Sequence, residues 1–81
     1  MNIQLIQGQF NAKDAIDIIT QMIYIKVNHL ESKINNASNE EDIKFWETKI
    51  KVLQNELVEI KRTIGTVSGN ISLKSAVEIQ H

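Results

Sequence analysis

Residues 43–67 carry an unbroken apolar stripe whose members are spaced alternately by three and four positions. The stripe consists of Ile43, Trp46, Ile50, Leu53, Leu57, Ile60, Ile64 and Val67. An apolar repeat that averages about 3.5 residues puts every member on one side of an α-helix, as in a coiled-coil seam. A solitary helix would leave this seam in water. The sequence therefore predicts a helix over 39–66 that packs lengthwise against another helix.

Residues 11–35 predict a second helix with a wider apolar surface. Its main stripe is formed by Ile16, Ile19, Ile23, Val27, Leu30 and Ile34. An adjoining stripe is formed by Ile18, Met22 and Ile25. Together the stripes exceed the roughly 100° of a simple amphipathic helix, so we expect this helix to be buried on two sides. The sequence contains no proline, so both helices can run without a kink.

Capping residues mark the beginnings of both helices. Asn11 can cap the first helix through its side-chain oxygen, and Ser38 followed by Glu41 fits the capping-box pattern for the second. Glu47 and Lys51 have the i,i+4 orientation that stabilises a helix by about 0.2–0.5 kcal/mol. Local signals therefore agree with the apolar periodicity about where each helix begins.

Short strands are predicted at both ends, over 2–10 and 70–80. Residues 70–80 alternate cleanly, with one face formed by Ile71, Leu73, Val77 and Ile79. This period of two is typical of a half-buried strand. Residues 2–10 alternate less regularly, and Gly8 is a candidate position for a bulge or bend.

The predicted fold is mostly α within the α+β class, a single domain over 1–81 with the order β-α-α-β. The break at residues 35–38 allows only an antiparallel turn-back, so the helices form a hairpin and the strands emerge at its open end. Neither a two-helix hairpin nor a two-stranded ribbon encloses a core in so small a chain. We therefore expect a homodimer whose hairpins form a four-helix bundle. Strand pairing within or between chains, and dimer against tetramer, stay open.

The candidate interface combines the second stripe of the first helix with the seam and its aromatic flank. It consists of Ile18, Met22, Ile25, His29, Phe45, Trp46, Ile50, Leu53, Leu57, Ile60 and Ile64. We interpret His29 as a boundary residue, because no ligand-type side chain lies four positions away on either side. Lys26 can lay its stem on apolar surface while its ammonium stays in water. Glu56 is a candidate partner for Lys26 in an ion pair between subunits.

Composition narrows the class of function. The chain has no cysteine, which excludes a disulfide scaffold, a thiolate nucleophile and cysteine-ligated metals. No apolar run approaches the roughly 20 residues of a membrane span, and the first residues do not resemble a signal peptide. Motifs for nucleophilic catalysis, phosphate loops and zinc proteases are absent, and the acidic run at 40–42 is explained by its place at a helix start. We expect a soluble cytoplasmic protein that is not an enzyme and uses no metal or cofactor.

Two functions fit these expectations. The first is a structural module that acts as a homo-oligomer and binds a protein partner through the bundle face or the strand edges. The alternative is a small DNA-binding regulator, because the strand-helix-helix order is similar to that of ribbon-helix-helix proteins and Gln4, Gln7 and Gln9 can read base edges. The net charge of -1 and the lack of Lys and Arg in 2–10 argue against nucleic acid. Richness in Ile, Asn and Lys is typical of AT-rich genomes and favours a bacterial or phage source.

Overall fold

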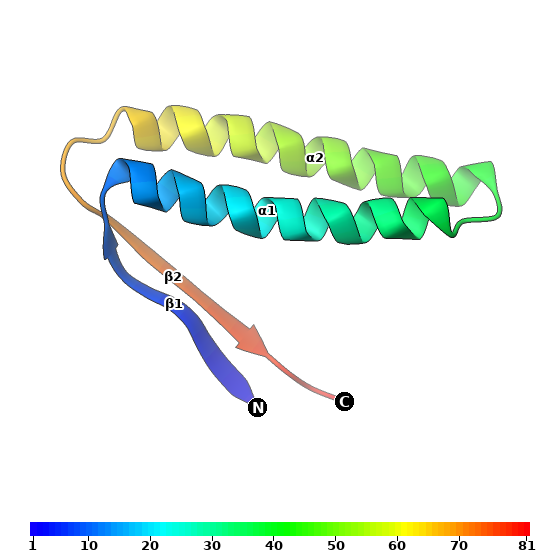
Figure 1. The fold of residues 1–81 in the computed structure, drawn as a ribbon, viewed down its shortest axis with the longest axis horizontal. Coiled ribbons are helices and arrows are strands. Elements are labelled where there is room, and N and C mark those ends of the chain that lie inside the picture. The colour runs from blue at the N-terminus through cyan, green and yellow to red at the C-terminus, as the bar shows by residue number, and fades with distance from the viewer.

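Two long helices and two terminal strands follow one another in the order β-α-α-β in the computed structural model, which describes residues 1–81. The elements are β1 (Asn2–Phe10), α1 (Ala12–Asn35), α2 (Glu40–Gly65) and β2 (Ile71–Glu78). Figure 1 shows α1 and α2 side by side as an antiparallel hairpin, with the two strands leaving its open end. The predicted mostly helical β-α-α-β fold with a helical hairpin is confirmed.

Both helices begin at an asparagine cap. Asn11 Oδ1 accepts a hydrogen bond of 2.8 Å from the backbone N–H of Asp14, as predicted. The predicted cap of α2 at Ser38 is wrong by one residue. The cap is Asn39, whose Oδ1 accepts from the backbone N–H of Asp42 at 2.9 Å while its Nδ2 donates to the Asp42 carboxylate at 3.1 Å. Apolar periodicity locates a helix end only to within one or two residues, so it does not choose between neighbouring capping residues.

The seam of α2 packs against the main stripe of α1 in the same chain. Val27 and Leu30 of α1 form a buried cluster with Leu53 of α2, and the partly buried residues around this cluster are Ile23, Trp46 and Ile50. Each apolar side chain removed from water contributes about 1.5–3 kcal/mol to folding. The partner helix that the seam requires is therefore α1.

The two strands pair antiparallel with each other and form a two-stranded ribbon within the chain. The register runs from Phe10 opposite Ile71, beside the helices, to Asn2 opposite Glu78, near the termini. Directly opposite residues share a face, and faces alternate along each strand. One face, here called the inner face, is half-buried where it lies beside the helices and exposed at its tip, and it carries Ile3, Ile6, Gly8, Phe10, Ile71, Leu73, Ser75 and Val77.

A bulge explains the irregular spacing of β1. The register slips between Gln4 and Ile6, so Leu5 has no cross-strand partner. One extra residue reverses the alternation, and the apolar residues before and after it consequently share the inner face. The bulge is therefore at Leu5. Of the two possibilities predicted for Gly8, a bulge or a bend, the bulge is wrong, because Gly8 pairs with Leu73 in the regular register.

This fold buries only a small part of its side-chain surface. Only 6 of 81 residues are buried. The radius of gyration is 15.4 Å, whereas a compact domain of this length has about 12 Å. The accessible surface is 6358 Å², whereas a compact monomer of this mass exposes about 5,000 Å². With principal extents of 47 × 33 × 12 Å, the chain is a flat molecule whose apolar surface is only partly covered.

Candidate protein-interaction surface

The ribbon and the helical hairpin meet at the open end of the hairpin and diverge from there, so they form an open wedge (Figure 1). The wedge contains a groove of about 470 Å³. Its apolar lining comes from all four elements and consists of Ile6, Ile18, Ile19, Met22, Ile23, Ile60 and Leu73. The wedge is therefore an apolar hollow that the chain builds but does not fill.

The helical side of the wedge continues as apolar surface toward the turn of the hairpin. Ile25 follows Met22 by three positions, which places it on the same side of α1, and it is 70% exposed. On α2, Val52 lines a shallower hollow together with Glu56 and Ile60, and it is 51% exposed. We call this side of the hairpin the ribbon-side face, and its main members are Ile18, Met22, Ile25, His29, Phe45, Val52 and Ile60.

The tip of the ribbon carries a second uncovered apolar surface. Ile3 and Val77 are cross-strand partners on the inner face, and each is 41% exposed. Leu5 at the bulge and Ile79 beyond β2 are exposed as well. Figure 1 shows that the ends of the two strands lie away from α1, in agreement with this exposure.

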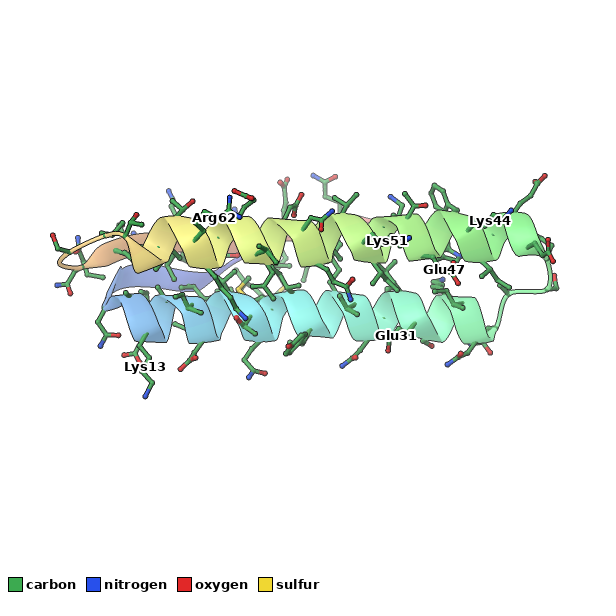
Figure 2. All side chains as sticks on the ribbon, turned by 90° about the horizontal axis from the view of Figure 1, so that it is seen from above. Lys13, Glu31, Lys44, Glu47, Lys51 and Arg62 are labelled. Atoms are coloured by element: carbon green, nitrogen blue, oxygen red, sulfur yellow. The ribbon has the colours of Figure 1, made fainter.

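Charged residues gather on the opposite face of the hairpin. Figure 2 views the hairpin from the side away from the ribbon and shows, along that face and its edges, Lys13, Glu31, Lys44, Glu47, Lys51 and Arg62. The sole ion pair of the structure joins exposed Arg62 and Glu59 at 3.0 Å, and the predicted pair of Glu47 with Lys51 is not formed. Such charged side chains are typical of a surface that remains exposed to solvent.

Two opposite charges lie in the wedge without a partner in the chain. Lys26 of α1 and Glu56 of α2 line the main groove and also a smaller neighbouring hollow. Neither side chain forms an ion pair within the chain. The wedge thus offers one cation and one anion amid apolar surface.

An aromatic pair lies near the turn of the hairpin. The rings of Phe45 and Trp46 meet edge to face with their centroids 4.8 Å apart, and Lys49 Nζ lies 4.9 Å from the Phe45 centroid. Trp46 packs against the buried cluster, whereas Phe45 stays exposed. One member of the pair therefore belongs to the core and the other to the ribbon-side face.

The residues predicted as interface divide into two groups. The group that packs inside the hairpin of its own chain is Trp46, Ile50, Leu53, Leu57 and Ile64. The group on the ribbon-side face is Ile18, Met22, Ile25, His29, Phe45 and Ile60. Only the second group leaves surface available to another molecule.

Sequence reasoning missed the contribution of the ribbon to this surface. Val77 and Ile79 continue the apolar alternation of β2 past the part of the ribbon that lies beside α1. That continuation is a usable signal, because apolar side chains beyond the reach of the core require some other cover. Val52 was recognised as flanking the seam beside Phe45, two helical turns away on the same side of α2, but it was not included in the predicted interface.

Neither metal-binding clusters nor membrane-spanning segments are found in this structure. No group of three or more His, Asp or Glu side chains is placed to hold a metal ion. Neither helix contains an apolar stretch of the length and hydropathy needed to cross a membrane.

Comparisons with known proteins give no relative. No protein-family model matches the chain, and no curated protein or solved structure is significantly similar to it. Function is therefore argued from the geometry of the wedge and its surroundings.

Proposed function

We propose that this chain is a small structural protein-interaction module that acts as a homo-oligomer and catalyses no reaction. The uncovered wedge carries the proposal. Its groove adjoins the ribbon-side face at Ile60, so exposed apolar side chains of both helices and of the ribbon lie on one side of the hairpin. Monomeric proteins rarely expose contiguous apolar patches larger than a few hundred Å², and larger ones mark contact sites for other proteins.

The strand edges offer a second mode of contact with a protein partner. In a ribbon of only two strands, each strand has one outer edge whose backbone N–H and C=O groups have no strand beside them. An extended segment of another protein can add to such an edge through backbone hydrogen bonds. A homo-oligomer that hides its apolar faces would keep these edges accessible for a partner.

The alternative of a small DNA-binding regulator draws on the polar outer face of the ribbon. Lys74 is the sole Lys or Arg of the two strands, so few phosphate contacts are available. Gln4 is also engaged locally, because its Nε2 donates to the carbonyls of Ile6 and Ser75 at the bulge. These observations favour the protein-interaction module over the DNA-binding function.

Molar mass measured by size-exclusion chromatography with light scattering tests the proposal. We expect a multiple of the 9.3 kDa chain mass that persists over a wide dilution range. A chain that stays monomeric at every concentration and still melts cooperatively would overturn the homo-oligomeric function. A gel shift at low salt tests the alternative, and we expect no complex with duplex DNA.

A further inference from the structure

We infer that the occupant of the wedge is a second copy of this chain, and that two copies bury their ribbon-side faces against each other about a two-fold axis. This assignment rests on the proposed homo-oligomeric function and names the surface responsible for it. The charged face opposite the ribbon then remains on the outside of the assembly.

The exposed area matches what a stable dimer needs. The chain exposes 6358 Å², which is roughly 1,400 Å² more than a compact monomer of its mass. A standard protein interface buries about 800 Å² on each partner, and obligate homodimers bury more than about 1,000 Å² on each. The excess surface of one chain is therefore of the size that a second copy buries.

The surface is also suited to meeting itself. A two-fold interface presents the same patch on both subunits, so the patch must be self-complementary. Apolar side chains such as Ile25 and Val52 satisfy this condition, because they pack favourably against apolar side chains of a second copy. The net charge of -1 per chain produces little repulsion between copies.

The two unpaired charges of the wedge support the same occupant. Lys26 and Glu56 lie on different helices and line the same groove. In a symmetric pair, the lysine of each copy can meet the glutamate of the other, which gives two equivalent contacts and leaves no charge unmatched. A partner with an entirely apolar surface would leave both charges without counterparts.

The shape of the chain allows a second copy to enter. The wedge is closed at the open end of the hairpin and widens toward the turn (Figure 1). In that view no helix lies between the ribbon-side face of the hairpin and the tip of the ribbon. A second hairpin laid on the ribbon-side face thus supplies the missing helical layer.

Two valines of α2 allow a matched test. Val52 lies on the ribbon-side face and is 51% exposed, and Val58 is 55% exposed. Val58 is seven positions from Lys51 and four from Arg62, so it belongs to the opposite, charged face. The experiment compares the molar masses of wild type, Val52→Glu and Val58→Glu by light scattering over a dilution series. Both sites are half in water, so neither substitution disturbs the hairpin core.

We expect a wild-type dimer, a Val58→Glu dimer of equal affinity, and dimerisation of Val52→Glu weakened by at least about a hundredfold, because the interface would bury an unpaired charge. Ile25→Glu on the other helix should behave like Val52→Glu. Far-UV circular dichroism confirms that each variant keeps its helices.

Different failures have different meanings. A helical Val52→Glu that stays as dimeric as wild type overturns the wedge as the interface and leaves the homo-oligomeric function intact. A Val58→Glu variant that dissociates while remaining helical assigns the interface to the charged face and overturns the inference as well. A wild-type chain that is monomeric throughout, and dimerises in neither variant, overturns both the inference and the proposed function.

Discussion

On the side away from the ribbon, the helical hairpin carries lysines, glutamates and an arginine, whereas on the ribbon side the same two helices carry Ile18, Met22, Ile25 and Val52. Between these faces lies the seam, where Leu53 is 9% exposed. Ile25, only two residues from buried Val27 on α1, is 70% exposed. Of the two apolar stripes on α1, one is therefore buried and the other is exposed, because the chain supplies only one partner helix.

The comparison shows that a sequence can contain more apolar helix surface than a single folded chain buries. The seam is filled by α1, so its contribution to folding is made inside one molecule. The ribbon covers the ribbon-side face only near the open end of the hairpin. The rest of its apolar surface can contribute to stability only when another molecule binds there. The following predictions test this difference, from the largest expected effect to the smallest.

Truncation in the seam should have the largest effect. We expect Leu53→Ala to lower the free energy of unfolding by about 2–5 kcal/mol, because it removes a buried side chain and leaves a cavity between the helices. Urea denaturation at one fixed protein concentration measures the change. The exposed control Val58→Ala should stay within about 0.5 kcal/mol of wild type. Equal effects at the two sites would mean that the seam is not the core.

A charge on the inner face of the ribbon tip should weaken self-association. We expect Val77→Glu to raise the dissociation constant of the dimer by about tenfold, because the interface would bury an unpaired carboxylate in place of the exposed part of a valine. Sedimentation equilibrium measures this constant. The neighbouring Ala76 lies on the outer face, so Ala76→Glu serves as the control and should leave the constant unchanged. If both variants behave as wild type, the ribbon tip lies outside the interface.

The start of α2 should depend on one cap. We expect Asn39→Ala to destabilise the fold by about 1 kcal/mol, because the backbone N–H of Asp42 loses its side-chain acceptor. Thermal melts followed by circular dichroism give the difference. Ser38→Ala removes the neighbouring capping-type residue, and we expect it to change stability by less than about 0.5 kcal/mol. A larger loss for Ser38→Ala would show that the cap is at Ser38.

The smallest expected effect is a gain in stability at Thr20. Its Oγ1 is buried and has no hydrogen-bond partner. Thr20→Val replaces this hydroxyl by a methyl group of similar shape, so we expect the free energy of unfolding to rise by up to about 1 kcal/mol. Chemical denaturation beside wild type provides the measurement. A loss of stability would mean that the hydroxyl has a partner in solution.

Elements with strong periodicity were predictable from the sequence, and departures from regularity were not. The seam from Ile43 to Ile64 has an unambiguous 3,4 spacing, and α2 was found within one residue at each end. β1 was found as a strand, but its bulge at Leu5 depends on how it pairs with β2. A pairing register is a property of two strands together, and the pattern of either strand alone does not contain it.

The candidate site was predictable only in part for a similar reason. Ile18, Met22 and Ile25 were recognised as an extra stripe because their spacing is local to one helix. Which residues of α2 stay free of the seam depends on where α1 packs, and this is why buried Leu57 and exposed Phe45 entered the same predicted set. Val52 became visible as part of the surface only once the ribbon defined a side of the hairpin.

The sequence by itself determined the two helices, their antiparallel turn-back, the terminal strands and the apolar stripe that the seam does not use. These features follow from repeats of about 3.5 and 2 residues and from a turn of few residues, all of which act between near neighbours in the chain. The tertiary structure decided that β1 pairs with β2, that the ribbon diverges from α1, and that a wedge remains between them. Those features join residues far apart in the sequence, such as Ile6, Ile60 and Leu73, and only the packed chain brings them together.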